Sequence, residues 1–531
     1  KIMDGVQKNY DFLHPEKSVA ELLKAKNLIA GLKDEFWRER KTKEINDVIL
    51  QCLGLYAEAI ASAHTAVRGE VIKTDIEVVK RLPGKAILKR IALHPAGKDT
   101  LVMKELGDNE TYLQTYSFTV PTNAWHTNAY WLNERGSMGM YKVDQAEWIG
   151  LPETPRQIMV QFDFELNGQA LSITRPVAYK YNSPEDGETY RPFEVTPEVS
   201  VNFSEKVIVF GDNHTRKVSV SVKAGAANQK GKVRLPVSNG WSVSPAYYEF
   251  DIAEKNAEQR FEFDVSPPAT SGELTLQAEA EINGNIYNKQ LITISYDHIP
   301  TQLVYMPAET RLVRLDIKKA GNRLAYIPGA GDEVAKSLRQ IGYIVDEIEA
   351  AQLRGDQLNQ YDAVILGVRA YNTNEDLKFK QKEILEYARQ GGNVIVQYNT
   401  NNRLTVGANL GPYPLKIGRE RVTVEEAPVR FLHPEHEVLN YPNKITEKDF
   451  EGWVQERGLY FASEWDAAYT PILSCNDPGE DARDGGMLIA KYGEGNFIYT
   501  GYSWFRQLPA GVAGAYRIFA NMVSLGKDIK P

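Results

Sequence analysis

The hydrophobic period changes twice along this chain, and that change constrains the fold more than any other feature. Apolar residues recur at helical spacing from residue 17 to 66, and then alternate with polar residues from about 70 to 297. From about residue 303, short apolar runs alternate with helical stretches. Amphipathic helices, half-buried strands and buried parallel strands each have one of these patterns. The sequence therefore predicts a multidomain α/β plus all-β protein.

The first segment, residues 1–68, is predicted to be helical. Leu22, Ile29 and Phe36 lie on one apolar stripe, and a second stripe runs from Ile45 to Ala63. Two amphipathic helices cannot bury both apolar faces against each other alone. We therefore expect them to pack on the next domain or on a segment outside this chain.

Two β-rich blocks follow, residues 69–186 and 187–299, and each contains an Asn-Gly dipeptide between alternating runs. Asn167-Gly168 and Asn283-Gly284 are predicted to form hairpin turns, because Asn and Gly tolerate positive φ angles. The two motifs are 116 residues apart, since 283 − 167 = 116. That spacing favours two tandem immunoglobulin-like β-sandwiches, although shared hairpin chemistry alone could produce the same match.

Residues 300–531 are predicted to form an α/β domain. Buried strands are expected at 324–327, 363–366 and 394–396, with helices at 376–390 and 512–525. Alternation of short buried strands with helices is typical of a mainly parallel sheet covered on both faces.

Composition excludes some functions. The 531 residues carry a net charge of −8, which argues against non-specific nucleic-acid binding. No apolar run approaches the roughly 20 residues that a membrane span needs. Two cysteines, Cys52 and Cys475, are too few for a cysteine-ligated zinc site. The opening residues resemble neither a signal peptide nor an initiator start, so we expect a processed chain or part of a longer one.

Three segments of the last block resemble the class I glutamine amidotransferase-like fold in its ThuA-like branch, a doubly wound, flavodoxin-like architecture. They are Tyr361–Gly367, Gly391–Val396 and Gly493–Tyr499. Two further segments, Tyr10–Ser18 and Leu439–Ile445, resemble the C-terminal two-thirds of PIG-L/LmbE-type de-N-acetylase fusions from Bacteroidetes-like bacteria.

This resemblance implies an accessory region of a carbohydrate de-N-acetylase. In the fusions a zinc deacetylase domain comes first, so zinc is expected only in that absent domain, and residues 1–68 would be its tail. The implied location is secreted, periplasmic or on the surface of a Gram-negative bacterium. The implied partners are a glycan or a cell-envelope protein.

Two motifs resemble catalytic signatures, and neither fits its chemistry. His433-Pro434-Glu435-His436-Glu437 resembles the zinc loop of the deacetylases, but it lies deep in the last domain and contains a proline, so we interpret it as a surface turn. An amidotransferase needs a cysteine on the elbow after Val396, where this chain has Gln397. We therefore expect no catalytic residues in this chain.

A ligand site is still predicted beyond the carboxyl ends of the strands, where open α/β sheets bind their ligands. Aromatic, amide and guanidinium groups there suit sugar rings and anions. The candidate residues are Arg369, Tyr371, Asn372, Gln397, Tyr398, Asn399, Asn402, Tyr502, Trp504 and Arg506. Alternatively, these loops are simply polar and their aromatic residues close the top of the sheet.

Two weaker signals stay open. The turn Gly329–Gly331 is typical of half a dinucleotide fingerprint, but Asp332 after it is better interpreted as a helix N-cap. The aromatic stretch from Trp125 to Trp148 is either a glycan platform or the core of a long insertion. Three hypotheses remain: a binding module, a hydrolase acting through the last domain, and a ligand-free structural subunit of an envelope complex.

Overall fold

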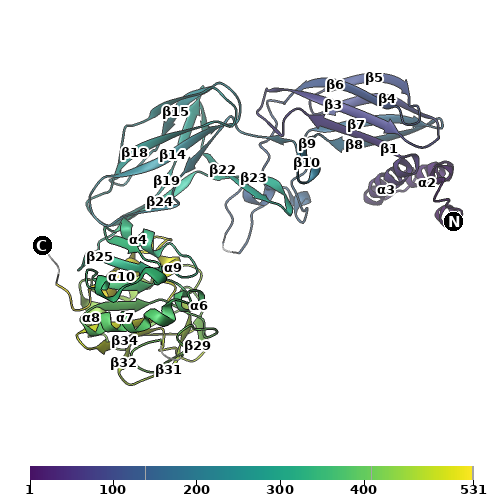
Figure 1. Cartoon of the computed structure of the whole chain (residues 1–531). Coiled ribbons are helices and arrows are strands. Elements are labelled where there is room, and N and C mark those ends of the chain that lie inside the picture. Colours follow the sequence, from purple (N-terminus) through teal and green to yellow (C-terminus); the bar gives the residue numbers. More distant parts are fainter. Residues whose placement is uncertain (138, 408–409, 529–531) are drawn as a thin grey trace.

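A computed structural model describes residues 1–137, 139–407 and 410–528. The chain forms an extended row of bodies, with helices at the N-terminal end, two β-domains next and an α/β domain last (Figure 1). The predicted combination of helices, all-β and α/β parts is confirmed at this coarse level. Within the described residues, no helix is both long enough and apolar enough to cross a membrane.

The N-terminal helices are α1 (Ile2–Lys8), α2 (Val19–Ala30) and α3 (Glu35–Leu53). Helix α3 begins after Asp34, whose carboxylate accepts a hydrogen bond from the Trp37 amide (3.1 Å). Leu22 and Ile49 are fully buried and share one core with the first β-domain. The helices therefore pack on the following domain, one of the two arrangements expected.

The helical segment ends earlier than predicted. Gly54 adopts the left-handed conformation (φ 55°) and ends α3, and β1 (Leu55–Ala61) and β2 (Thr65–Ala66) follow. The predicted continuation of the helix to residue 66 is wrong. Tyr56 and Ile60 are four residues apart, which fits a helix, but both belong to the strand β1.

The first β-domain consists of two facing sheets with strand orders β10-β9-β1-β3-β6 and β5-β4-β7-β8. Their strands are β3 (Val71–Lys80), β4 (Ala86–His94), β5 (Lys98–Glu105), β6 (Thr111–Thr119), β7 (Met159–Leu166), β8 (Gln169–Pro176), β9 (Ala178–Ser183) and β10 (Gly187–Pro192). On β7, buried and partly exposed residues alternate strictly, as the period of two predicted.

The second β-domain contains the sheets β12-β14-β18-β16, β17-β15-β20-β21 and β13-β24-β19. The strands are β12 (Val199–Phe203), β13 (Val207–Phe210), β14 (Arg216–Ala224), β15 (Gln229–Arg234), β16 (Ser242–Ser244), β17 (Tyr248–Ile252), β18 (Glu258–Ser266), β19 (Gly272–Gln277), β20 (Glu279–Ile282), β21 (Asn285–Tyr287) and β24 (Glu309–Arg314). Because β24 pairs with β13 and β19, this body extends past residue 299.

Both predicted Asn-Gly turns are confirmed. Asn167 (φ 50°) and Gly168 (φ 77°) join β7 to β8, and Asn283 (φ 49°) and Gly284 (φ 80°) join β20 to β21. Positive φ at both central residues is the geometry that matches the twist of a two-residue hairpin.

The α/β domain contains a seven-stranded sheet with the order β26-β25-β27-β28-β35-β34-β32. The first five strands are parallel and the last two are antiparallel to their neighbours. They are β25 (Arg323–Ile327), β26 (Ile344–Glu347), β27 (Ala363–Leu366), β28 (Asn393–Val396), β32 (Tyr469–Pro471), β34 (Met487–Tyr492) and β35 (Gly495–Thr500).

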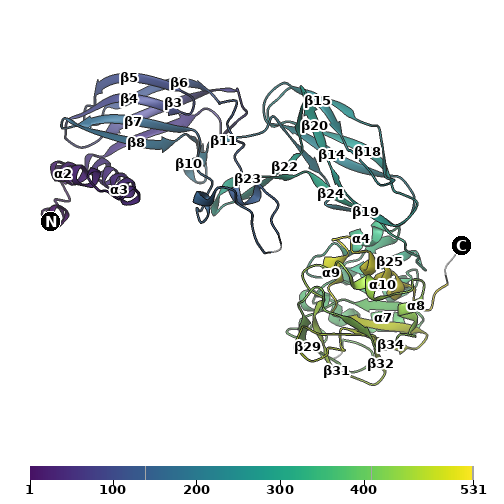
Figure 2. The same ribbon diagram turned by 180° about the vertical axis from the view of Figure 1, so that it is seen from behind.

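Helices cover both faces of this sheet, as predicted. Helices α4 (Val334–Gln340) and α10 (Ala513–Ser524) contribute to one apolar core, and α7 (Leu377–Arg389) contributes to the other. The first of these cores also contains Val209 and Val313 from the second β-domain. The two bodies therefore share a continuous apolar interface, and the view from behind shows β24 and β19 next to α4 (Figure 2).

Candidate functional site

The carboxyl ends of β27, β28 and β35 meet at one edge of the parallel sheet, and all ten predicted residues follow those ends, in loops or in the short helices α6 (Ala370–Thr373) and α9 (Trp504–Gln507). Half of them are buried. Tyr371, Trp504 and Asn399 have no exposed surface, and Gln397 and Tyr502 are 1% exposed. The Trp504 indole N–H donates to Thr500 Oγ1 (2.8 Å), and the Tyr371 hydroxyl donates to Gln381. These five side chains support the loops from inside.

Asn372 ties two loops together. Its side-chain amide donates to the carbonyls of Thr400 (3.2 Å) and Asn402 (2.9 Å), and its oxygen accepts from the Thr400 amide (2.9 Å). The Asn402 residue is itself exposed. Asn372 therefore fixes the shape of the edge and has its own hydrogen bonds largely occupied.

Arg369, Tyr398 and Arg506 are the predicted residues that the structure brings together with partial exposure. The Tyr398 ring stacks on Tyr460 (5.9 Å between centroids, 12° between planes) and packs against Phe505 (5.4 Å). Burial raises the pKa of Tyr398, while the nearby charges of Arg369 and Arg506 oppose that rise. We call Arg369, Tyr398, Tyr460, Phe505 and Arg506 the sheet-edge surface.

The backbone of the sheet-edge surface is held in an uncommon conformation. Arg369 (φ 58°) and Tyr460 (φ 54°) both lie in the left-handed region, which costs a non-glycine residue roughly 1–3 kcal/mol. The Arg369 amide donates to the Tyr398 carbonyl (2.8 Å), and the Tyr499 hydroxyl donates to the Tyr460 carbonyl (2.6 Å). A strained backbone persists only where surrounding contacts hold it in place, and such residues are concentrated at binding and catalytic sites.

The two arginines differ in their partners. Arg506 lies over the Phe505 ring (4.9 Å) and forms an ion pair with Glu456 (2.7 Å). Arg369 forms no ion pair within the described residues, and its buried Nε has no hydrogen-bond partner there. Arg369 is thus the donor at this edge that remains available to an acceptor group.

A polar cluster lies beneath the sheet-edge surface. The Asp332 carboxylate accepts hydrogen bonds from the Val334 amide (2.9 Å), the Val368 amide (3.1 Å) and the Tyr326 hydroxyl (2.6 Å). The N-cap of α4 is Glu333, so the predicted N-cap at Asp332 is wrong by one residue. Burial and the Asp332 charge raise the pKa of Tyr326. Gln397 donates to the Tyr326 oxygen (3.3 Å). Its own buried Oε1 has no partner in the described part of the chain.

Neither cysteine is placed for nucleophilic chemistry. Cys475 has no exposed surface, and its Sγ lies 3.3 Å from the Tyr502 hydroxyl. Burial raises the pKa of the Cys475 thiol to about 11, so the reactive thiolate is disfavoured at neutral pH. Cys52 is 7% exposed on α3, in the other part of the molecule.

The histidine motif forms a turn, as interpreted from its proline. His436 precedes α8 (Glu437–Asn440), and its Nδ1 accepts a hydrogen bond from the Val438 amide (3.1 Å). His433 contacts Glu435 (3.4 Å). The residues described contain no cluster of three or more His, Cys, Asp or Glu side chains arranged to hold a metal.

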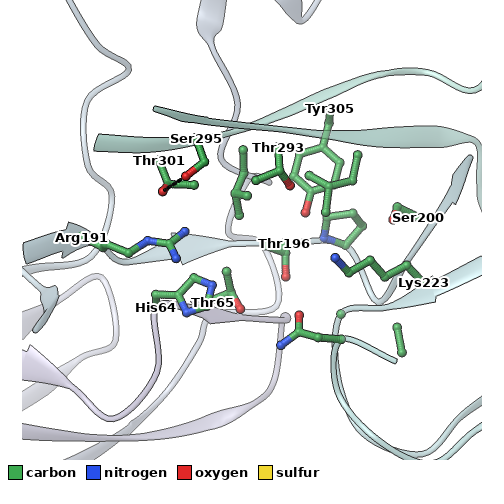
Figure 3. Close-up of a pocket in the computed structure, with 16 residues that line it drawn as sticks. His64, Thr65, Arg191, Thr196, Ser200, Lys223, Thr293, Ser295, Thr301 and Tyr305 are labelled. Carbon is green, nitrogen blue, oxygen red and sulfur yellow. Dashed lines mark hydrogen bonds between the residues drawn. The ribbon is translucent and has the colours of Figure 1, made fainter. Parts of the chain in front are cut away.

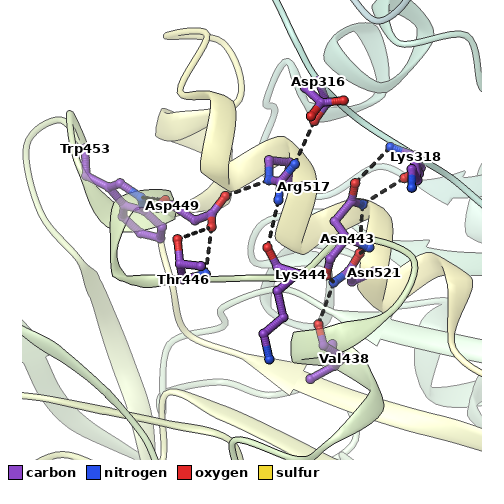
Figure 4. A network of polar contacts seen from close by, with 10 residues as sticks. All are labelled: Asp316, Lys318, Val438, Asn443, Lys444, Thr446, Asp449, Trp453, Arg517 and Asn521. Carbon is purple, nitrogen blue, oxygen red and sulfur yellow. Dashed lines mark hydrogen bonds and ion pairs between the residues drawn. The ribbon is translucent and has the colours of Figure 1, made fainter. Parts of the chain in front are cut away.

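The segment Leu439–Ile445, one basis of the family resemblance, packs against α10 (Figure 4). The Asn443 amide donates to Asn521 Oδ1 (3.0 Å), and Asn521 donates to the Val438 carbonyl (2.8 Å). Beside this pair, Arg517 bridges Asp449 (2.7 Å) and the Lys444 carbonyl (2.7 Å). The buried bonds between Asn443, Asn521 and Val438 give the segment a structural role.

The aromatic stretch of the first β-domain has a mixed character. Trp125 and Trp148 lie 6.1 Å apart, and Tyr130, which is buried, packs against Trp131 (4.8 Å). Trp125 is 45% exposed. The stretch thus contains both core and surface rings, so the two interpretations of its sequence both stay open.

Sequence reasoning missed Tyr460, Phe505 and Glu456. Tyr460 lies on β31 (Gly458–Trp465), a strand outside the seven-stranded sheet, and Glu456 lies two residues before that strand. Phe505 directly follows the predicted Trp504, and the Trp-Phe-Arg run was the available signal for it.

Comparisons with known proteins assign no family. No protein-family model and no curated protein matches the chain. Among solved structures, a β-galactosidase from Rahnella sp. R3 is 14% identical, with a TM-score of 0.25, over 39% of this chain and 32% of its own. An exo-β-1,4-mannosidase from Opitutaceae bacterium strain TAV5 is 14% identical, with a TM-score of 0.26, over 39% and 37%. A Salmonella α2-macroglobulin mutant is 8% identical, with a TM-score of 0.17, over 49% and 16%.

The chain thus spans about a third of the length of the first two structures. Every one of these TM-scores is below 0.5, so these likenesses assign neither a fold nor a function to the chain.

Proposed function

We propose that this chain is a non-catalytic accessory region that binds and positions glycan for a larger carbohydrate de-N-acetylase of the PIG-L type, secreted or periplasmic. In this proposal the zinc belongs to a deacetylase domain outside the chain. The observation that supports it most is the partly exposed Tyr398 ring, which contacts Tyr460 and Phe505 and has two guanidinium groups nearby.

The chemistry of the sheet-edge surface suits a sugar. Aromatic rings pack well against the C–H faces of sugar rings, and a guanidinium presents several donors in a fixed plane. Arg369 has a donor to spare, whereas the Glu456 carboxylate offsets the charge of Arg506. An acetamido group offers a neutral carbonyl acceptor, while a free amine would bring a positive charge beside Arg369. We therefore expect a preference for N-acetylated sugars.

We also assign the two β-domains to immunoglobulin-like sandwiches and the α/β domain to the class I glutamine amidotransferase-like fold. The strand order β26-β25-β27-β28-β35 supports the second assignment, because it places the first strand between the second and the third, as in doubly wound sheets. The extended arrangement in Figure 1 supports a spacer role for the β-domains.

A second candidate is a carbohydrate hydrolase acting through the same domain. The polar cluster of Asp332, Tyr326 and Gln397 beneath a strained Arg369 is the observation that favours it. The buried Cys475 and its raised pKa favour the binding function instead.

The test is calorimetric titration with the tetrasaccharide of N-acetylglucosamine, with its de-N-acetylated form for comparison. Tyr398→Ala should weaken binding of the acetylated form about tenfold, which corresponds to about 1.4 kcal/mol of lost stacking. Tyr247→Ala is the matched control, because Tyr247 is 47% exposed and directly precedes β17 in the second β-domain.

Equal affinity of the wild type and Tyr398→Ala would refute this function, and so would the lack of any binding. Release of shorter sugars during the titration would favour the hydrolase. Binding of a cell-envelope protein but no sugar would assign the same surface to a protein partner.

A further inference from the structure

A second site lies between the two β-domains, far along the chain from the sheet-edge surface. A cavity of about 320 Å³ opens where three parts of the chain meet (Figure 3). The first β-domain contributes β2 and the end of β10, and the second contributes β12 and β14. The third wall is a hairpin of β22 (Lys289–Tyr296) and β23 (Ile299–Pro307).

Hydrogen bonds fix these walls against one another. Asn202 of β12 exchanges two bonds with the backbone of Leu291 (2.9 and 3.2 Å). Asn128 exchanges two with the backbone of Tyr305 (3.0 and 2.9 Å). Lys255 of the second β-domain donates to the Thr65 carbonyl of the first (2.7 Å). The cavity is therefore preorganised, which reduces the entropic cost of binding a ligand.

Two cations line the cavity. Arg191 and Lys223 extend toward each other from opposite sides in Figure 3. Neither forms a hydrogen bond from its side chain or an ion pair with a described residue, and the buried Nε of Arg191 has no partner. None of the lining residues is Asp or Glu. Partly buried cations without counter-charges are unusual, because burial of charge is normally compensated by a paired group.

The pKa of His64 reflects the same positive charges, whereas the pKa of the nearby Glu194 is dominated by burial. Burial and the charges of Arg191, Lys255 and Lys223 lower the pKa of His64, another lining residue, to about 4. The carboxyl group of Glu194, 5% exposed, lies close enough to Arg191 to feel its charge, yet burial raises its pKa to about 7. Near neutral pH this carboxyl group is only partly ionised, so it leaves the cavity positive.

The remaining lining carries hydroxyl groups and a small apolar wall. Thr196 is 3% exposed, and its Oγ1 has no partner among the described residues. In Figure 3 the hydroxyls of Thr293 and Tyr305 point to the middle of the cavity. Hydroxyl groups both donate and accept, which matches the hydroxyls of a sugar. Leu291 and Leu303 supply apolar surface for the C–H face of a ring.

We infer that this cavity binds an acidic monosaccharide unit, with its carboxylate or sulfate held by Arg191 and Lys223 and its ring hydroxyls by Thr196, Thr293 and Tyr305. Its volume is near the lower end of the range for small-molecule pockets, roughly 300–1,000 Å³. One sugar ring therefore fits better than a longer buried chain. This site shares no residue with the sheet-edge surface, so either can fail without the other.

The experiment titrates the whole chain calorimetrically with D-glucuronate and D-glucose 6-sulfate, using D-glucose and inorganic sulfate as the neutral and sugar-free probes. We expect both acidic sugars to bind at least tenfold more tightly than glucose and more tightly than sulfate alone. Arg191→Gln and Lys223→Gln should each weaken glucuronate binding at least tenfold. Lys217→Gln is the matched control, because Lys217 lies on the same strand, is 69% exposed and pairs with Glu262 outside the cavity.

Equal binding of glucuronate and glucose would overturn the inference, as would unchanged affinity in both cavity variants. Inorganic sulfate that binds as tightly as glucose 6-sulfate would overturn the sugar part. If a variant fails to fold, the wild type still provides a test by NMR. Glucuronate should raise the pKa of the His64 imidazole above its value in the free protein, because the bound anion stabilises the protonated form, whereas glucose should leave it unchanged.

Discussion

The sheet-edge surface and the cavity between the β-domains differ in how far their polar groups are already satisfied. At the sheet edge, five of the ten predicted side chains are buried and Arg506 is paired with Glu456, which leaves Arg369 as the one predicted arginine there without an ion pair among the described residues. In the cavity, Arg191 and Lys223 face each other without a carboxylate partner among the described residues. The first region was predicted from the ends of the strands in the sequence. The second is recognised from two cations that have no carboxylate partner.

This difference separates two uses of polar residues. Tyr371, Trp504 and Asn399 use their hydrogen bonds to hold loops in shape, so a ligand gains little from them. Arg191 and Lys223 have been partly removed from water without compensation, so a ligand that supplies the missing charge gains the interaction energy. Unpaired buried groups are therefore the better guide to a binding site here.

The largest expected effect tests whether buried sheet-edge residues are structural. Trp504→Ala should lower the free energy of unfolding of the α/β domain by about 3–5 kcal/mol, because the side chain has no exposed surface. Tyr398→Ala should cost less than about 1.5 kcal/mol, since its ring is partly exposed. Urea unfolding of both variants checks this prediction. A similar decrease in unfolding free energy for the two variants would contradict the division into buried structural residues and partly exposed surface residues.

The next effect concerns the buried carboxyl beside the cavity. The folded pKa of Glu194 is about 7 against an ordinary 4.5, so the folded state binds its proton more tightly than the unfolded state. This contribution to stability is full below about pH 4.5 and is lost as the pH rises through 7. Relative to Glu194→Gln, the wild type should lose about 2–3 kcal/mol of unfolding free energy between pH 5 and pH 8.

The measurement is the difference in unfolding free energy of the first β-domain between the two proteins at each pH. Groups common to both, such as His64 and His126, cancel in this difference. A difference that does not vary with pH would show that Glu194 is ionised in the folded state like an exposed glutamate.

Charge reversal in the cavity tests whether the two sites bind their ligands independently. Lys223→Glu should weaken glucuronate binding about a hundredfold, or about 2.7 kcal/mol, because a carboxylate then faces the ligand's own. Binding of the N-acetylglucosamine tetrasaccharide should stay unchanged in the same variant. Calorimetry with both sugars checks this, and loss of both affinities would mean that the variant disturbs the whole chain.

The smallest effect is the dependence on salt. Raising the ionic strength from about 0.05 M to about 0.5 M should weaken glucuronate binding severalfold, because it screens the partly exposed cations. The neutral tetrasaccharide should change less than twofold under the same conditions, since stacking on Tyr398 carries no net charge. Equal salt dependence of the two affinities would contradict the claim that charge contributes to binding in the cavity but not at the sheet edge.

Local patterns predicted much of the fold. Period-two alternation predicted β7, and the Asn-Gly dipeptides predicted two hairpin turns with positive φ. The strand β1 was missed, because Tyr56 and Ile60 satisfy helical spacing, and only the left-handed Gly54 separates α3 from the strand. A single glycine in a long apolar pattern is a weak signal for such a break.

Burial and long-range proximity limited the prediction of sites. The strand ends could be located from sequence, but whether Tyr371 or Tyr398 faces solvent depends on which loop covers each ring. The cavity was out of reach, since His64, Arg191 and Lys223 lie on strands or loops far apart in the chain and meet only when the β-domains pack together. No local sequence pattern predicts that residues so far apart in the chain lie close together.

The most direct test of two independent sites is a crossed calorimetric titration of Arg191→Gln and Tyr398→Ala with D-glucuronate and the N-acetylglucosamine tetrasaccharide. The account predicts that Arg191→Gln loses glucuronate binding and keeps the tetrasaccharide, while Tyr398→Ala does the reverse. Loss of both ligands in either variant, or glucuronate binding no tighter than glucose in the wild type, would contradict it.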